Sequence, residues 1–380
     1  MMPRNEIDFI LRSDALEKNG GDGFQIEQYR KNLAQAGFDV QCIPFHVSMV
    51  LRPNSIVHIV NVDRPFDFLA AVRIAGDRPI VVSTIHHDLT SVREMRKAER
   101  NQGLRTLAGR VLPESGRELL AFSVRTARKI RTSSDGQKWA TTWLRSLPTV
   151  GTVWRAVGST LDGVHTVALL AEGERNSLTR DTRWQGRNGK LIPNGKPAGR
   201  STGDSSEPGR TWSHRLHDIC VVGRIEPRKR QLEIARAATA LGQSVVFAGH
   251  PSPSSPRYVA DFEAVVAADP NLVWVGGVEH EEVLDLMGNS RVLLNGSWVE
   301  VQSLVDIEGA AAGCWVVVGR GGNSSEWLGA SVVAVDTHDV SQLLSKAAEV
   351  LQKNVEPSPT DYSHTWEMAS EKLAEIYAEL

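Results

Sequence analysis

The 380-residue chain has few cysteines, no long apolar run and almost no net charge. Its three cysteines, Cys42, Cys220 and Cys314, stand too far apart for a zinc motif or a disulfide framework, so we expect buried thiols. No run approaches the roughly 18 consecutive apolar residues of a membrane-spanning helix, and no apolar stretch of signal-peptide length stands near the N-terminus. These absences favour a reducing cytoplasm as the location.

Two kinds of ligand are also disfavoured by what is missing. The net charge of −2 provides no overall field that would attract nucleic acid. The glycine-rich segment 19–25 does not have the GxGxxG pattern, so a nicotinamide cofactor is poorly supported. Its glycines still permit a tight turn whose N–H groups could face an anion, and a flexible loop is the alternative.

Strand-like and helix-like segments alternate along the chain, which is typical of a parallel sheet covered by helices. A stretch rich in Gly, Ser and Pro interrupts this pattern, and a second alternating series follows it. The length suits two α/β domains. We expect an N-terminal Rossmann-like domain over residues 1–195, a linker or exposed loop over 196–214, a second Rossmann-like domain over 215–358 and a terminal helical segment over 359–380.

Two carboxylates, Glu300 and Glu308, bracket a predicted strand-to-helix turn in the second half. The start of such a helix presents unpaired backbone N–H groups that attract a phosphate. A carboxylate on each side can accept hydrogen bonds from sugar or ribose hydroxyls. The alternative is a surface helix with two solvated glutamates.

A second predicted strand-to-helix turn lies about eighty residues earlier and is basic. An apolar run ends at Gly223, and Arg224 and Lys229 flank the turn that follows. Both side chains can reach one anion, and they would stabilise the charge that develops on a departing diphosphate. A solvated basic turn is the alternative, since Arg228 and Arg230 are also charged.

The Arg-x4-Lys pair and the Glu-x7-Glu pair together resemble the motifs of the retaining glycosyltransferases of the GT-B fold, family 4. The likeness extends to segments 245–249, 272–278 and 315–326 and covers the C-terminal half of the chain well. One departure concerns the turn, which reads Glu300-Val-Gln-Ser-Leu304 where the family has Glu-Gly-Phe-Gly-Leu. A side chain at Ser303 stands where the backbone approaches the sugar phosphate, so the donor pocket would be reshaped or weakened.

The resemblance implies an α/β fold of two Rossmann-like domains that face each other across a deep cleft, with the last helix crossing back to the first domain. It implies transfer of a hexose from a nucleotide-diphosphate sugar, by default a UDP-sugar, to a saccharide or lipid-linked acceptor, with retention of configuration and without a metal. The absence of an Asp-x-Asp pair agrees with the last point. The residues so implied for catalysis are Arg224, Lys229, Glu300 and His86, and those for donor binding are Gly20, Gly21, Gly223, Gly249, Gln302, Ser303, Leu304 and Glu308.

His86 and His87 end a predicted strand of the first half, at the sheet edge where open α/β folds bind ligands. A histidine there could bind the donor sugar or its phosphate, or could be structural. By resemblance, the Thr-x-His pattern of the family falls on His86, and the loop with Gly20 and Gly21 faces the donor.

Residues 91–150 are basic in an otherwise near-neutral chain, with thirteen Lys and Arg against five Asp and Glu. Interleaved apolar residues predict amphipathic helices, which could attract an anionic membrane surface. A solvated helical face is the alternative, and an RNA-binding patch is disfavoured because aromatic residues are sparse there.

Two other functions stay open at this point. The same two-domain plan could carry a sugar-nucleotide epimerase or hydrolase that uses carboxylates as acid and base. The altered turn at Gln302 and Ser303 would also suit a non-catalytic protein that binds sugar nucleotide in a polysaccharide-assembly complex.

Overall fold

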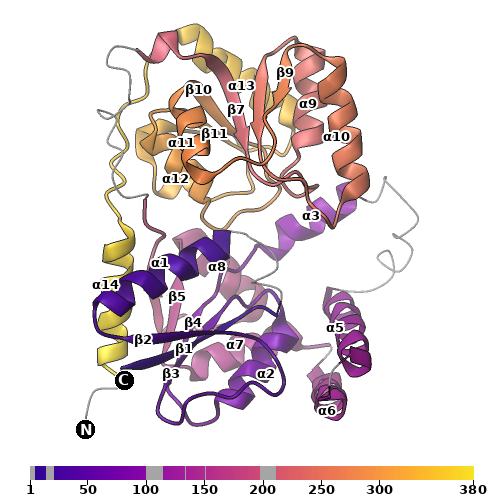
Figure 1. Ribbon diagram of the computed structural model, residues 1–380, viewed down its shortest axis with the longest axis vertical. Helices are drawn as coiled ribbons and strands as arrows, with labels where there is room; N and C mark the ends of the chain where they lie inside the picture. The colour runs from indigo at the N-terminus through magenta and orange to yellow at the C-terminus, as the bar shows by residue number, and fades with distance from the viewer. Residues whose placement is uncertain (1–4, 14–20, 100–113, 133, 150, 197–210) are drawn as a thin grey trace. The chain divides into compact units, whose positions relative to one another are not determined.

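The computed structural model describes residues 5–13, 21–99, 114–132, 134–149, 151–196 and 211–380. The chain divides into two compact units (Figure 1). The first unit comprises residues 1–89, 100–195 and 366–380, and the second comprises 90–99 and 196–365. Gly20, residues 100–113 of the basic region and residues 197–210 of the predicted linker lie outside the described residues.

The first unit is built on a six-stranded parallel sheet of order β2-β1-β3-β4-β5-β6. Two central strands are mostly Ile and Val and are buried throughout, as expected where helices cover both faces of a parallel sheet. The strands are β1 (Glu6–Leu11), β2 (Asp39–Pro44), β3 (Ile56–Val60), β4 (Ile80–Ser83), β5 (Thr166–Leu169) and β6 (Gly189–Leu191).

Helices cover both faces of this sheet. Helices α2 (Pro65–Ala75) and α7 (Val153–Gly163) pack against each other, and α8 (Glu172–Thr182) packs against α7 and β5. Helix α1 (Gly21–Gln35) packs beside α14 (Trp366–Ala378), as Figure 1 shows in indigo and yellow. The last helix therefore belongs to the first unit, and its predicted return to that domain is confirmed.

Helix α14 is joined to the first unit by buried aromatic contacts. The Trp366 ring meets the Phe24 and Tyr29 rings edge to face, with centroids 5.8 and 5.9 Å away. The Tyr377 hydroxyl contacts Nδ1 of His58, a buried residue of β3. Burial lowers the pKa of His58 to about 3, so its ring is neutral.

Two further helices of the first unit carry part of the basic region. Helix α5 (Glu114–Thr132) packs on α2, where Phe122 stacks on Phe66 with ring centroids 5.4 Å apart, and α6 (Gly136–Ser146) packs on α5. The basic region of residues 91–150 also includes most of helix α3 (Leu89–Glu99). Residues 90–99 of this helix group with the second unit.

The second unit contains another six-stranded parallel sheet, of order β12-β11-β10-β7-β8-β9. Apolar side chains on its two faces form two separate clusters. Helices α9 (Gln231–Leu241), α10 (Pro256–Ala268) and α13 (Val340–Lys353) cover one face, and α11 (His280–Gly288) and α12 (Leu304–Ala311) cover the other. The strands are β7 (His217–Val222), β8 (Val245–Ala248), β9 (Leu272–Trp274), β10 (Ser290–Asn295), β11 (Trp315–Val318) and β12 (Val332–Ala334).

The two sheets confirm the predicted α/β architecture, and the observed units differ from the predicted boundaries in detail. Residues 211–214 fell within the predicted linker, yet Trp212 is 3% exposed and its indole N–H donates to the Arg291 carbonyl oxygen at 3.0 Å. Residues 359–365 group with the second unit rather than with the terminal helix. The three cysteines are free, and Cys220 and Cys314 are buried as expected while Cys42 is half-buried.

Candidate functional site

The candidate site of the second unit lies at the carboxyl ends of β7, β8 and β10. Gly223 follows β7 and Gly249 follows β8, and both have positive φ, 143° and 152°. A Cβ on Gly249 would lie 2.0 Å from the Gly223 carbonyl oxygen, so only glycine fits there. The two glycines let the chain ends of β7 and β8 approach closely, and they shape the turn that carries Lys229.

Lys229 and Glu300, two of the predicted site residues, form an ion pair. Nζ of Lys229 donates to Oε1 of Glu300, and Nη1 of Arg228 reaches the same oxygen at 3.2 Å. Arg228 also pairs with Glu226 at 3.1 Å. These side chains come together because β7 and β10 are neighbours in the sheet and both turns leave the same edge.

Arg224, the predicted partner of Lys229, is half-buried and directly follows Gly223. Its carbonyl oxygen accepts a hydrogen bond from Nε2 of Gln231 at 2.8 Å, which fixes the first part of the turn. The sequence suggests Arg228 only as part of a solvated basic turn, whereas the structure places its guanidinium on Glu300. The turn thus brings Arg228 as well as Lys229 to one carboxylate.

Glu300 is held in its charged form. Burial would raise its pKa, but Lys229 and Arg228 outweigh burial and lower the pKa to about 2. The carboxylate therefore stays ionised throughout the neutral pH range. It can accept hydrogen bonds from hydroxyl groups and stabilise nearby positive charge.

The altered turn, Gln302 to Leu304, begins α12 and is tied to its surroundings by its side chains. Ser303 caps the helix, since its Oγ accepts from the Asp306 backbone N–H at 3.3 Å. Its φ is −77°, a value that does not require glycine. Gln302 is buried and donates to the Tyr362 hydroxyl at 3.3 Å, and Leu304 is the half-buried first residue of the helix.

Glu308 lies on α12, one turn further in, and is paired with a residue that sequence reasoning missed. Its Oε1 accepts from Nε2 of His280 at 2.8 Å. This hydrogen bond raises the pKa of His280. Glu308 is 7% exposed, whereas 44% of the His280 side chain is exposed. A histidine at the start of α11 therefore orients one oxygen of the predicted ribose-binding carboxylate.

In the first unit, the predicted donor loop is described only from Gly21, which begins α1 and is exposed. Its neighbour Asp22 pairs with Arg12 at 2.7 Å. Because Gly20 lies outside the described residues, the loop's role stays a prediction.

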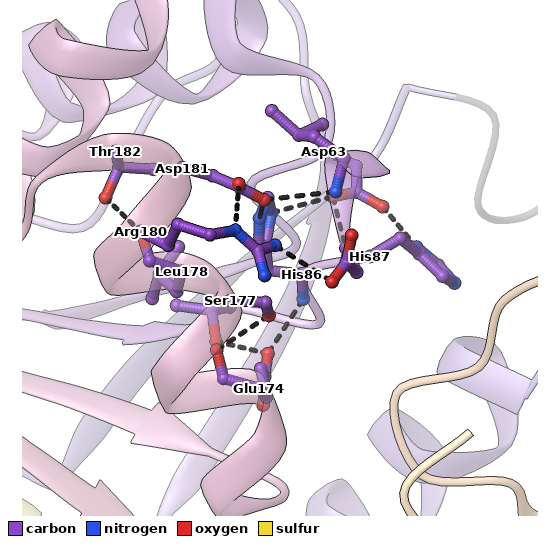
Figure 2. Close-up of polar contacts among 12 residues, drawn as sticks. Asp63, His86, His87, Glu174, Ser177, Leu178, Arg180, Asp181 and Thr182 are labelled. Atoms are coloured by element: carbon purple, nitrogen blue, oxygen red, sulfur yellow. Dashed lines mark hydrogen bonds and ion pairs between the residues drawn. The ribbon is translucent and has the colours of Figure 1, made fainter. Parts of the chain in front are cut away.

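His86, three residues after β4, is buried and lies in a cluster of charged groups (Figure 2). Its side chain is 0% exposed, with Nε2 at 3.1 Å from Asp181 of α8 and Nδ1 at 3.4 Å from Asp63, which follows β3. Burial lowers the pKa of His86, but the two carboxylates outweigh burial and raise the pKa to about 9. His86 is therefore an imidazolium at neutral pH.

His87 points away from the buried part of the cluster in Figure 2. Its backbone N–H donates to Oδ1 of Asp63 at 3.2 Å, and its Nδ1 contacts Oδ2 of the same residue. A quarter of its side chain is exposed. The adjacent histidines thus face opposite surroundings.

Glu174 of α8 forms hydrogen bonds with the segment that follows β4. Its Oε1 accepts from the Thr84 hydroxyl and from the His86 backbone N–H, at 2.5 and 2.7 Å, and its Oε2 accepts from the Leu170 N–H at 2.6 Å. Burial raises the pKa of Glu174. This buried carboxylate fixes the backbone that follows β4, so His86 and His87 are held rather than free to move.

Sequence reasoning missed Asp63, Asp181, His280 and the contacts of Arg228. Asp63 could have been found, because it follows a buried strand at the same sheet edge as His86. Asp181 lies on a polar helix and gives no signal in the sequence. Among the described residues, no group of three or more His, Cys, Asp or Glu is arranged to hold a metal ion.

Part of the second unit matches a known family, and the whole chain resembles several solved structures. Residues 217–353 match the model of a family described as glycosyl transferases group 1. A sequence comparison with curated proteins finds no match. Sucrose-phosphate synthase from Thermosynechococcus elongatus superimposes with a TM-score of 0.63 at 14% identity, over 99% of each chain.

The fold is that of the GT-B glycosyltransferases. The HepE protein of Anabaena, solved in complex with UDP and glucose, has a TM-score of 0.63 at 12% identity over 98% of this chain and 99% of its own. A UDP-forming trehalose-phosphate synthase from Burkholderia xenovorans, in complex with glucose-6-phosphate, has a TM-score of 0.53 at 14% identity over 96% and 79%. The GT-B fold class predicted from the sequence is thereby confirmed. No helix among the described residues combines the length and apolarity needed to cross a membrane.

Proposed function

We propose that the protein transfers a hexose from a nucleotide-diphosphate sugar to a saccharide or lipid-linked acceptor, with retention of configuration. The observation that carries the proposal is the pairing of Lys229 with Glu300 at the carboxyl end of the sheet, within the segment that matches glycosyl transferases group 1. A mobile ammonium group beside a permanently charged carboxylate suits a diphosphate and a sugar placed side by side.

In this reaction the bond between the anomeric carbon and the diphosphate breaks, and negative charge accumulates on the leaving oxygen. Lys229 and Arg224 would stabilise that charge, and the protein's own cations make a metal ion unnecessary. Glu300 would accept hydrogen bonds from the sugar hydroxyls and stabilise the positive charge of the oxocarbenium-like ring. Glu308 would accept from the ribose through Oε2, while His280 holds Oε1.

UDP is the proposed nucleotide because two of the similar structures name it: HepE is solved with UDP, and the trehalose-phosphate synthase is UDP-forming. The latter structure also holds glucose-6-phosphate, which supports a phosphorylated sugar among the acceptors to be tried. The altered turn does not abolish the helix start, since Ser303 caps α12 by its own hydroxyl. We therefore propose a reshaped donor pocket rather than an inactive protein.

We also propose that the first unit contacts an anionic membrane surface through α5 and α6. The outward face of α5 combines apolar Leu120 and Val124, 46% and 53% exposed, with the exposed basic residues Arg128 and Arg131. Positions three and four apart share one face of a helix, so the four side chains form a continuous strip. Such a mixed apolar and basic face suits the boundary between headgroups and acyl chains.

Nucleotide binding and transfer are tested with purified protein. UDP, GDP, ADP and their glucose conjugates are compared by thermal shift, where a true ligand at a hundredfold excess over its dissociation constant stabilises the protein by about 2.7 kcal/mol. Transfer is then followed as nucleotide release with glucose-6-phosphate and other saccharide acceptors. We expect Lys229→Ala to lower kcat/KM by about 100-fold or more, as removal of a group that stabilises transition-state charge does.

Lys353→Ala is the matched control, because Lys353 is an exposed lysine at the end of α13. Full activity is expected for this variant. If no nucleotide sugar shifts the unfolding temperature, the proposal is wrong. Turnover without any acceptor at a rate equal to transfer would favour the epimerase or hydrolase instead.

A further inference from the structure

A buried arginine with an unusual backbone conformation directly follows Lys229. Arg230 has a φ of 63°, in the left-handed region that residues other than glycine rarely adopt, and it is the N-cap residue of α9. It is 7% exposed, and its Nε has no hydrogen-bond partner among the residues that the structure describes. Burial lowers the pKa of Arg230, because it disfavours the charged form. Both the backbone conformation and the buried charge are unfavourable, so other contacts must compensate for them.

The guanidinium of Arg230 lies over an aromatic ring of another turn. Its Cζ is 4.2 Å from the centroid of the half-buried Trp298 ring, in the turn between β10 and α12. Its Nη1 donates to the carbonyl oxygen of His338, in the turn between β12 and α13. The His338 ring also contacts Trp298, with centroids 4.8 Å apart. A cation over an aromatic face gains most where water is excluded, so this contact compensates for the burial of Arg230.

Three consecutive basic residues, Arg228, Lys229 and Arg230, all contact the turn that carries Glu300. The Arg228 carbonyl oxygen accepts from the Trp298 N–H at 2.9 Å, and Nη1 of Arg228 donates to Glu300 at 3.2 Å. Lys229 pairs with the same carboxylate, and Arg230 lies over the Trp298 ring. Lys229 therefore has a neighbour on each side that joins the two turns.

We propose that Arg230 and Trp298 are positioning residues for sugar transfer, and that their contact holds the turn of Lys229 against the turn of Glu300. The inference rests on the proposed function and adds two residues to it. Arg230 is buried, so it acts through Lys229 rather than on the donor. A small displacement of a charged group from its productive position lowers the rate strongly, even when the group itself is unchanged.

The backbone of the turn does not by itself explain an arginine at position 230. Glycine adopts a φ of 63° without strain, and it would bring no buried charge. The contact with Trp298 does explain the residue, because a planar guanidinium can lie flat on an indole ring whereas the compact ammonium group of lysine cannot.

Arg230→Gly removes this contact and keeps a residue that suits the backbone. We expect kcat for transfer from UDP-glucose to fall by about 10-fold, while the KM for UDP-glucose stays within about 2-fold of the wild type. The loss falls on kcat because the charge that Lys229 stabilises develops only in the transition state. Arg236→Ala, which removes an exposed arginine of the same helix, is the control and should leave both values unchanged.

Position 298 offers a matched pair of variants. Trp298→Phe retains an aromatic face for the guanidinium, whereas Trp298→Leu retains only apolar volume. We expect kcat of the Phe variant within about 3-fold of the wild type, and a loss of about 10-fold in the Leu variant. Equal kcat values of the two variants would contradict the role of the ring, and this comparison does not require Arg230→Gly to fold.

Combined substitutions test whether the residues act as a unit. Arg230→Gly with Trp298→Leu should lose about 10-fold in kcat, rather than the roughly 100-fold expected of independent effects. In a Lys229→Ala background, Arg230→Gly should cost less than about 2-fold, because no ammonium group remains to be positioned. Multiplied losses in the first combination, or a further 10-fold loss in the second, would overturn the positioning role.

Two other results would also overturn it. One is a wild-type kcat in Arg230→Gly, and the other is a lower unfolding temperature of that variant without a change in kcat, which would show a structural role alone. Both results leave the proposed function intact, because the wild type still transfers sugar. A wild-type protein that neither binds nor turns over any nucleotide sugar refutes the proposed function, and the positioning role with it.

Discussion

At the scale of single residues, two electrostatic pairs of the candidate site join side chains that are remote in sequence. Lys229 and Glu300 stand 71 positions apart, and His86 and Asp181 stand 95 apart. Both pairs bury charge, and removing one partner would weaken the compensation of the other, which Arg228 also provides for Glu300 and Asp63 for His86. These contacts therefore stabilise the fold and define its chemistry at the same time.

His86 makes stability depend on pH in a defined direction. Its pKa in the folded protein is about 9, above the ordinary value of 6.5, so the folded state binds a proton more tightly than the unfolded state. The stabilisation is fully present below pH 6.5 and is lost as the pH rises through 9. We expect an NMR titration to show one histidine ring that protonates near pH 9, together with a fall in unfolding temperature between neutral pH and pH 9.

His86→Asn assigns that signal. We expect the NMR signal that titrates near pH 9 to be absent from the variant, and the unfolding temperature of the variant to depend less on pH. Both results would support a protonated, buried His86. If no histidine of the wild type titrates above neutral pH, the ion pairs with Asp63 and Asp181 do not form in solution.

Sequence reasoning could find the residues of the site but not the directions of their side chains. Lys229 and Glu300 meet because both follow neighbouring parallel strands, which the apolar runs reveal. The choice between His86 and His87 could not be made, because consecutive side chains point to opposite sides and the partner that buries His86 comes from α8. The backbone of the basic turn could not be predicted either. Arg230 has a φ of 63°, which is unusual for a residue other than glycine, and the spacing of the basic residues does not indicate it.

At the scale of elements, strands were the easiest to predict and the packing of helices the hardest. The runs at 56–60 and 80–83 are mostly the β-branched residues Ile and Val, and they form β3 and β4 with those bounds. The sequence predicts a terminal helix, but it does not predict the contact of this helix with His58. That contact depends on a buried polar atom, and apolar periodicity carries no information about such atoms.

The contact between α14 and β3 predicts a cost for one hydroxyl group. Tyr377→Phe leaves Nδ1 of buried His58 without its partner, so we expect the free energy of unfolding to fall by about 1–3 kcal/mol. Denaturant titration measures it. Lys372→Ala, at an exposed position of the same helix, should change it by less than about 0.5 kcal/mol. Equal stability of Tyr377→Phe and wild type would mean that water replaces the hydroxyl.

At the scale of the whole molecule, charge is distributed unevenly. The net charge is −2, yet the outward strip of α5 carries Arg128 and Arg131 beside two exposed apolar side chains. A local basic strip can attract an anionic surface, while the low net charge limits non-specific binding elsewhere on the protein.

Vesicle flotation tests that surface. We expect the protein to float with vesicles of phosphatidylcholine and phosphatidylserine and to remain unbound with phosphatidylcholine alone. Arg128→Gln with Arg131→Gln should weaken binding by about 2 kcal/mol, or about 30-fold, because each basic residue near an anionic surface contributes about 1 kcal/mol. Lys353→Gln with Lys372→Gln removes the same charge elsewhere and should leave binding unchanged. Equal weakening by both pairs would show that only net charge matters.

The place of α14 in the first unit also has a consequence for how the protein is made. Trp366 covers Phe24 and Tyr29 of α1, yet the ribosome must first synthesise residues 196–365. At about 5–20 residues per second, that stretch takes roughly 8–35 s. Throughout this interval the α14 side of α1 lacks its aromatic cover, and we expect chaperones to bind the N-terminal half until translation reaches the last helix.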